Sequence, residues 1–171
     1  DENQIIIVVA DGLGSAIYSK EGSSKIVSIA IRFLAERHDL SNIAFDIHLQ
    51  EIELPLLNGK TVLLVNDESK YGFAMTEKVL ESYEKIAIIT TPTLLKARLE
   101  SSIIRKNFKN VSLVMVGAES FPPELFDRIK SCSNAIVING YGPTETTCGI
   151  LYDEITDSKN VTIGTPIANA K

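Results

Sequence analysis

The sequence has few cysteines and no long apolar run, and each shortage excludes a class of protein. Its two cysteines, Cys132 and Cys148, are too few for a disulfide framework and lack the spacing of metal ligands. No apolar run approaches the roughly 18 residues of a membrane-spanning helix. The first residues also lack the basic segment of a signal peptide. These absences predict a reduced, cytoplasmic setting and no membrane partner.

Positive charge is scarce as well. The chain has 17 Lys and Arg residues against 22 Asp and Glu residues, which gives a formal net charge of -5. Because a negatively charged protein is repelled by phosphate backbones, nucleic acid is not expected as a partner. With 171 residues, 44% of them hydrophobic and 23% charged, the sequence is typical of one globular domain.

The sequence alternates short apolar runs with amphipathic segments. The runs expected to form strands are 5–10, 42–45, 60–65, 85–89, 111–116 and 135–138, with 161–163 as a further strand outside the alternation. The segments expected to form helices are 24–38, 47–57, 75–83, 92–99 and 123–130. Strands that alternate with helices form right-handed βαβ units. We therefore predict an α/β fold: a flavodoxin-like three-layer sandwich with a mostly parallel sheet and helices on both faces.

One stretch offers the groups of a ligand site. Asn139-Gly140-Tyr141-Gly142-Pro143-Thr144-Glu145-Thr146-Thr147 follows the run 135–138, at a strand end where open α/β sheets bind ligands. Its glycines let the backbone approach a ligand. Thr144 offers a hydroxyl to a phosphate, Glu145 a hard carboxylate to Mg²⁺, and Tyr141 a ring on which a base can stack. The stretch predicts a glycine-broken binding loop, although an ordinary Gly/Pro loop with a Thr-Glu helix start has the same composition.

This string resembles the core loop of amino-acid adenylation domains of nonribosomal peptide synthetases, within the acyl-adenylate-forming superfamily. Further matches stand on both sides of this string, in the same order as in the family: Phe45-Asp46, Gln50-Glu51-Ile52, Leu56–Gly59, Thr91–Leu95, Val116–Pro122 and Ile163–Asn169. The resemblance covers residues 41–171 and implies the central flavodoxin-like portion of such a domain. Residues 1–171 are expected to form a single truncated core subdomain, in which 1–40 have diverged.

The resemblance also implies an amino-acid pocket. Asp46 would pair with the α-ammonium group of the amino acid. The rest of the implied pocket is mostly apolar, as for an aliphatic side chain, and consists of Ile47, Gln50, Ile89, Val114, Val116, Gly140, Cys148 and Gly149. The residues themselves leave other roles open, since Asp46 could cap a helix beginning at Ile47, and Ile89 and Val114 could be sheet core.

The implied nucleotide contacts lie on the later matches: Gly117, Ala118, Glu119, Asn139, Tyr141 and Thr144. Thr144 would contact the α-phosphate and Glu145 would bind Mg²⁺, so the resemblance makes these two the catalytic residues. The implied reaction joins an amino-acid carboxylate to the α-phosphorus of ATP, forming an aminoacyl-adenylate and releasing pyrophosphate. ATP and Mg²⁺ are the implied cofactors.

Residues Ala16–Lys25 resemble a decayed copy of the family's phosphate-binding loop. Lys20 and Glu21 intrude, and most glycines are missing. A phosphate cradle needs successive backbone N–H groups that point inward, and Glu21 would repel the anion. The family's ribose-binding aspartate and adenylation lysine, which follow the matched region, are not in this sequence either. We therefore expect a truncated or degenerate adenylation domain that is not catalytic by itself, binds ATP weakly, and has neighbouring synthetase domains as partners.

Two alternatives remain open. The chain could be an excised fragment of an active adenylation domain, or an unrelated α/β nucleotide-binding module. For the latter, Asp11-Gly12-Leu13-Gly14 is a partial dinucleotide fingerprint without its third glycine. Val62–Glu68 resembles the first strand and acidic cluster of a phosphorylation receiver, but no aspartate stands where a receiver has its phosphoacceptor.

Overall fold

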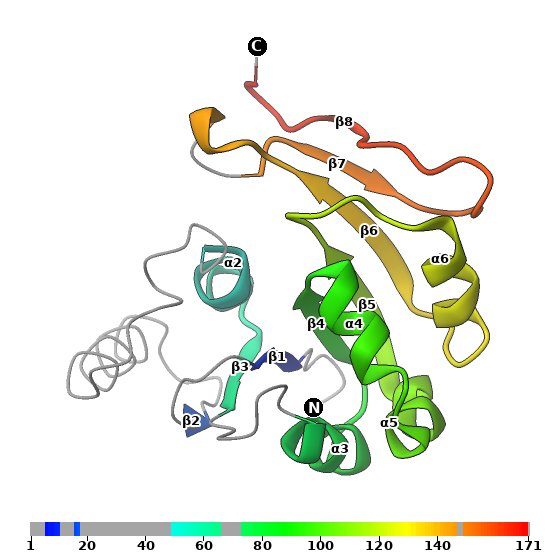
Figure 1. The fold of residues 1–171 in the computed structure, drawn as a ribbon. Helices are drawn as coiled ribbons and strands as arrows, with labels where there is room; N and C mark the ends of the chain where they lie inside the picture. The colour runs from blue at the N-terminus through cyan, green and yellow to red at the C-terminus, as the bar shows by residue number, and fades with distance from the viewer. Residues whose placement is uncertain (1–5, 11–15, 18–48, 66–72, 147–148, 171) are drawn as a thin grey trace. The chain divides into compact units, whose positions relative to one another are not determined.

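The computed structural model describes residues 6–10, 16–17, 49–65, 73–146 and 149–170 (Figure 1). The predicted helix 24–38, the predicted strand 42–45 and the segment Tyr18–Lys25 lie outside these residues. The chain divides into two compact units, Asp1–Ile86 and Ala87–Lys171. Each unit is described by itself.

Within its described residues, the first unit has strands β2, β3 and β1, adjacent in that order. Strand β1 (Ile6–Ala10) pairs in parallel with β3 (Thr61–Val65), and β2 (Ala16–Ile17) pairs antiparallel with β3. The π-helix η1 (Leu49–Glu53) continues into α2 (Leu54–Leu57), and α3 (Phe73–Ser82) follows β3. The apolar runs predicted as strands 5–10 and 60–65 are thereby confirmed to within one residue.

Helix α2 ends where the sequence predicts. The Asn58 side chain donates from Nδ2 to the Leu54 carbonyl at 2.7 Å, and the Gly59 amide donates to the Leu56 carbonyl at 3.0 Å. Gly59 has a φ of +66°, the left-handed conformation that closes many helices. Asn58-Gly59 is therefore a helix stop.

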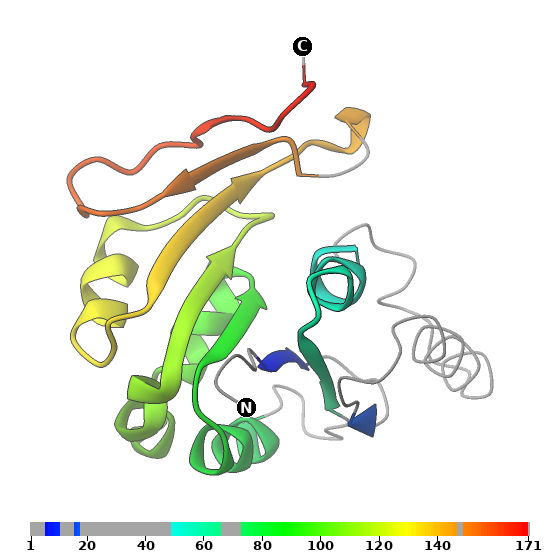
Figure 2. The same cartoon turned by 180° about the vertical axis from the view of Figure 1, so that it is seen from behind.

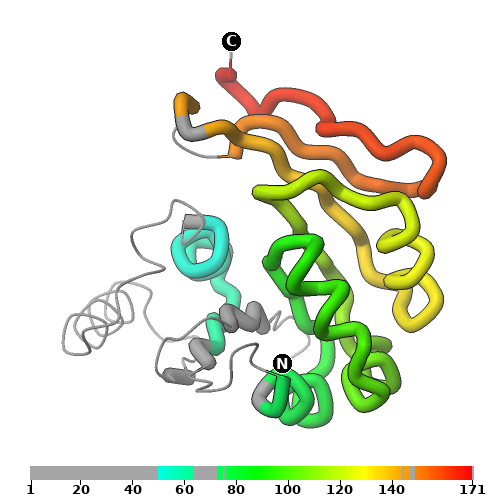
Figure 3. Tube along the Cα trace, in the orientation of Figure 1, coloured from blue at the N-terminus to red at the C-terminus, as the bar shows by residue number. Residues whose placement is uncertain are grey.

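The second unit carries the rest of the described elements (Figure 1). Its strands are β4 (Ile86–Thr90), β5 (Val111–Val116), β6 (Ile136–Tyr141), β7 (Leu151–Glu154) and β8 (Thr165–Pro166), adjacent in that order. Its helices are α4 (Pro92–Arg98), α5 (Ser102–Asn107), η2 (Phe108–Asn110), α6 (Pro123–Lys130) and η3 (Thr144–Thr146). Strands β4, β5 and β6 run in the same direction (Figure 2). Strand β7 pairs antiparallel with β6, and β8 pairs antiparallel with β7. Figure 3 traces these last segments side by side. The sheet is mixed and mostly parallel, so the predicted α/β class is confirmed.

Alternate residues of β5 and β6 have different surroundings. Val114, Val116 and Val137 are fully buried, and parallel register places Val114 beside Val137. On the other face of the same strands, Met115 is half-buried and Ile136 is 48% exposed. Because side chains alternate along a strand, one face of these strands is core and the other is only partly covered within the described residues.

Helices α4 and α6 lie on the same face of the strands. Lys96 pairs with Glu124 at 3.1 Å, and Arg128 pairs with Glu100 at 2.8 Å. Arg128 also donates to the Leu99 carbonyl at 2.8 Å. Helix α4 lies in front of the strands in Figure 1 and behind them in Figure 2, which shows that it covers one face.

Two sequence expectations need correction, and one helix was not expected. Strand β6 does not end at 138 but continues through Asn139, Gly140 and Tyr141, because β7 provides an antiparallel partner for these residues. Residues 161–163 are not a strand; the extension is formed by β7 and β8 instead. Helix α5 was not predicted. It begins after Ser101, whose hydroxyl accepts the Ile104 amide at 3.3 Å as an N-cap.

In the part of the chain that the structure describes, no helix has the length and apolar character needed to cross a membrane.

Candidate functional site

A cleft of about 590 Å³ opens in the second unit, beside the ends of β5 and β6. Three segments line it: the residues after β5, the end of β6 with its following loop, and the segment before β8. The lining residues are Ala118, Glu119, Ser120, Phe121, Asn139, Gly140, Tyr141, Gly142, Pro143, Val161, Thr162 and Ile163. The carboxyl ends of parallel strands therefore form a concave site, as open α/β folds do.

The backbone packs closely where β5 ends. Val116 lies beside Asn139 in the parallel register, and the Gly117 amide donates to the Thr90 carbonyl at 3.3 Å. A Cβ at Gly117 would lie 3.1 Å from the Gly140 carbonyl oxygen, so a side chain there would crowd β6. Ala118 then turns the chain with a φ of +66°. This turn brings the following residues to the cleft.

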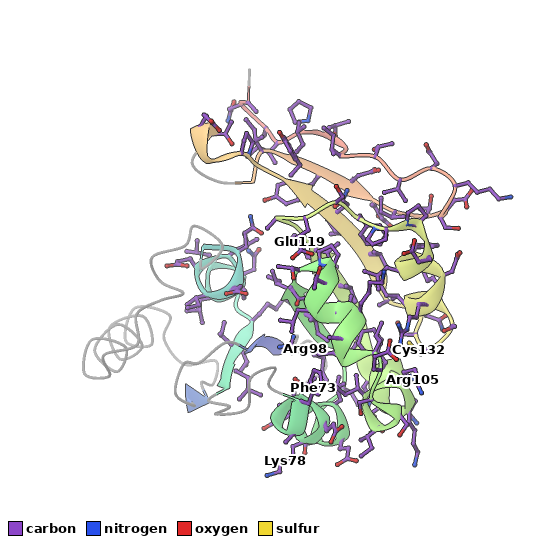
Figure 4. All side chains as sticks on the ribbon, in the orientation of Figure 1. Phe73, Lys78, Arg98, Arg105, Glu119 and Cys132 are labelled. Carbon is purple, nitrogen blue, oxygen red and sulfur yellow. The ribbon has the colours of Figure 1, made fainter. Side chains whose placement is uncertain are left out.

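Glu119 lines the cleft and also contacts the start of α4, beside which Figure 4 labels it. Its Oε2 accepts the Thr93 amide at 3.0 Å, one of the N–H groups that a helix start leaves without a partner inside the helix. Hydrogen bonds from Thr93 are the largest cause that lowers the pKa of Glu119, and a bond from Thr91 adds to them; desolvation opposes the shift. The carboxylate is therefore charged at neutral pH and engaged by α4.

Asn139 is the most buried polar residue of the cleft, at 6% exposure. Its Nδ2 donates to the Thr162 carbonyl at 2.8 Å. The Thr162 hydroxyl donates to Asp153 Oδ2 at 2.6 Å and accepts the Gly164 amide at 3.1 Å. Because Asp153 is the antiparallel partner of Asn139, two neighbouring strands hold Thr162 against the cleft wall.

Tyr141 presents its ring at the end of β6 with 44% exposure. Its carbonyl accepts the Ile150 amide at 2.8 Å, which fixes the backbone there. In the following loop, the Thr146 amide and hydroxyl both donate to the Pro143 carbonyl, at 3.0 and 2.8 Å. The loop is thus held by its own hydrogen bonds, and the exposed Glu145 lies within η3.

The charge of the lining is one-sided. Its described residues include the Glu119 carboxylate and no lysine or arginine. Phosphate groups bind best to cations and inward-pointing amides, whereas a neutral aromatic ring needs a stacking surface and a few polar partners. This cleft therefore suits a base better than a phosphate.

The predicted site residues are placed as follows. Ala118, Glu119, Asn139 and Tyr141 line the cleft with Gly140, and Gly117 adjoins it. Ile89, Val114 and Val116 are buried in β4 and β5, and Gly149 lies between η3 and β7. Gln50 belongs to the first unit, in η1. Asp46, Ile47 and Cys148 lie outside the described residues, and of Thr144 the structure describes only the backbone.

Sequence reasoning did not assign a site role to Ser120, Phe121 or Thr162. Ser120 and Phe121 lie inside the matched stretch Val116–Pro122, so the family resemblance offered a sequence signal for them. Thr162 stands one residue before the matched stretch Ile163–Asn169 and 23 residues from Asn139. Only the folded chain shows that its carbonyl meets the Asn139 side chain.

Fold and cleft together define an α/β protein with a concave site at the carboxyl ends of its parallel strands. Residues 34–171 match the AMP-binding enzyme family, and the chain belongs to this family. The chain is 31% identical over 135 residues to the nonribosomal peptide synthetase agiA of Aspergillus flavus, a match that covers 77% of this chain and 2% of agiA. It is 32% identical over 165 residues to the vanchrobactin synthetase VabF of Vibrio anguillarum, covering 89% of this chain and 6% of VabF.

Solved structures of adenylating proteins share the fold of this chain. The N-terminal subdomain of Klebsiella oxytoca NpsA, in complex with anthranilyl-AMSN, matches with a TM-score of 0.64 and 18% identity over 98% of this chain and 36% of that one. The four-domain nonribosomal peptide synthetase AB3403, bound to AMP and glycine, matches with a TM-score of 0.61 and 28% identity over 73% of this chain and 9% of that one. The predicted relationship is confirmed: the chain corresponds to part of a nonribosomal peptide synthetase adenylation domain.

Proposed function

We propose that this chain supplies the base-binding side of an adenylation site and does not by itself activate an amino acid. The observation that carries the proposal is the composition of the cleft: an exposed Tyr141 ring and the Asn139 carboxamide, with no lysine or arginine among the lining residues that the structure describes. Stacking needs only an accessible ring face and one or two polar partners. Neighbouring domains of a peptide synthetase are the proposed partners, consistent with the multidomain AB3403 match.

The reaction proposed for the complete site is attack of an amino-acid carboxylate on the α-phosphorus of ATP, with pyrophosphate leaving. Such transfers rely on positioning and on cations that neutralise developing charge. Thr144 and Glu145 remain the proposed groups for the α-phosphate and for Mg²⁺. The exposed Glu145 carboxylate on η3 is the hard oxygen ligand that Mg²⁺ prefers, and the bound ion would neutralise phosphate charge.

Weak ATP binding follows from the same reasoning. Residues Ala16–Lys25 depart from a phosphate-binding loop, and Glu119 adds negative charge to the cleft. A base contact alone supports a Kd in the millimolar range, about -4 kcal/mol. We expect ATP with Mg²⁺ to bind this chain no more tightly than that.

Amino-acid-dependent exchange of pyrophosphate into ATP tests the proposal. The purified chain is expected to show no exchange above background with any proteinogenic amino acid. Glu145→Ala serves as the matched control for a signal that depends on the site. Exchange that Glu145→Ala abolishes, or micromolar ATP binding by calorimetric titration, would show instead that the chain is a working fragment of an active domain.

A further inference from the structure

We infer that Asp153 and Thr162 are positioning residues that orient the Asn139 carboxamide, so that the cleft prefers a ring edge carrying an N–H donor. The inference rests on the proposed function, because it concerns which base the cleft holds. Neither residue lies within the motif stretches quoted from the sequence. Both act through Asn139 and are not proposed to touch the ligand.

The three residues form a closed arrangement. Asn139 and Asp153 are directly opposite each other in β6 and β7. The Thr162 hydroxyl is bonded to Asp153 Oδ2 at 2.6 Å, a short bond of the charge-assisted kind. The Thr162 carbonyl is bonded to Asn139 Nδ2 at 2.8 Å. Thr162 is therefore held by the same pair of strands that carries Asn139.

Gly164 fixes the remaining freedom of this segment. Its amide donates to the Thr162 hydroxyl at 3.1 Å, so that hydroxyl both donates and accepts. Gly164 also has a φ of +81°, a conformation that few side chains allow. The position of the Thr162 carbonyl is thus determined by a side chain bond and by a backbone turn.

The carbonyl in turn determines which way the carboxamide points. A carbonyl oxygen can only accept a hydrogen bond, so the NH₂ group of Asn139, and not its oxygen, must face Thr162. Asn139 lines the cleft, and within the described residues its Oδ1 accepts no hydrogen bond. The oxygen is therefore the group that remains for a ligand, and it accepts.

An acceptor in this place discriminates between ring edges. A base with an exocyclic amino group can donate to Oδ1, whereas a ring without that group cannot. The Glu119 carboxylate on the same lining is a second acceptor and adds no donor. If the Thr162 segment moved away, the carboxamide could rotate and present NH₂ or oxygen equally, and the preference would disappear.

The test compares AMP with purine riboside 5′-monophosphate, which lacks only the 6-amino group, by NMR titration of the 171-residue chain. The wild-type protein is expected to bind AMP about five- to tenfold more tightly, as for one net hydrogen bond. Thr162→Val keeps the side chain's shape and removes its hydroxyl, and is expected to reduce this ratio below about twofold. Thr162→Ser keeps the hydroxyl and should therefore show the same affinity ratio as the wild-type protein. Asp153→Ala should behave like Thr162→Val.

A merely structural role would weaken both ligands together and leave their ratio unchanged, and that result would overturn the inference. Equal binding of the two ligands by the wild-type chain would also overturn it, while leaving the proposed function intact. If neither ligand bound, the proposed function and the selectivity would fall together. In the absence of ligand, the Asn139 side-chain NH₂ protons should exchange with water more slowly in the wild-type chain and Thr162→Ser than in Thr162→Val. Equal exchange rates would show that the network does not hold the carboxamide.

Discussion

Among Gly59, Gly117, Gly140 and Gly164, it is Gly164 that leaves the least room for a side chain. Its φ is +81°, and a Cβ would lie 1.9 Å from the Tyr152 carbonyl oxygen. Gly164→Ala therefore must shift backbone, and we expect it to lower the free energy of unfolding by about 3 kcal/mol or more. Circular dichroism during urea unfolding measures the loss.

Gly59→Ala is the matched control for this prediction. Gly59 has a φ of +66°, but no heavy atom lies within 4 Å of its would-be Cβ. Only the left-handed backbone is then penalised, at about 1 kcal/mol. Equal effects of the two substitutions would mean that the contact with Tyr152 does not constrain the segment before β8.

At the scale of the element, Glu119 ties the cleft to helix α4 through the Thr93 amide. The hydrogen bonds from Thr93 lower the pKa of Glu119 in the folded chain, so its contribution is present above the ordinary value of 4.5 and is lost as the pH falls through the lowered one. Because the carboxylate is exposed, we expect Glu119→Gln to cost at most about 1 kcal/mol at pH 7. The difference from wild type should shrink below pH 4.5.

Urea unfolding at pH 7 and near pH 3 measures this difference. Added salt screens exposed charges, so the difference at pH 7 should also decrease at high ionic strength. A cost for Glu119→Gln that stays the same at both pH values would contradict a role for the charged carboxylate at the start of α4.

At the scale of the whole molecule, the second unit has a core of its own. Leu95, Leu99, Ile104, Phe108 and Leu125 are all fully buried, and each belongs to this unit. We expect residues 85–171, expressed alone, to fold cooperatively with a stability of about 4 kcal/mol, the low end for such a length. Dispersed NMR amide signals and a sigmoidal urea transition would report this.

Leu125→Ala in the same fragment provides the control. Removing a fully buried leucine side chain costs about 2–5 kcal/mol, so this variant should be largely unfolded. If the amide signals of the wild-type fragment were poorly dispersed, like those of Leu125→Ala, the second unit would depend on the first for its fold.

Much of the architecture was predictable because it depends on local pattern. Residues 111–116 and 123–130 were predicted with the bounds that β5 and α6 have, since a β-branched apolar run and a proline-started amphipathic segment each indicate one structure. The short helix α5 was missed because its six residues are stabilised by the Ser101 cap and by Arg105, which donates to the Leu99 carbonyl at 2.8 Å. Neither contact has a periodic signature.

The sequence alone determined the family and the residues at the end of β6, because these depend on contiguous strings such as Asn139–Thr147. It also determined the α/β class, because the alternation of apolar runs and amphipathic segments is a local pattern. The tertiary structure decided what depends on partners distant in the chain. It extended β6 to Tyr141 by pairing it with β7, and it placed Thr162 between Asn139 and Asp153. A hydrogen bond needs its two atoms within about 3 Å, and only the folded backbone brings residues so far apart in the chain to that distance.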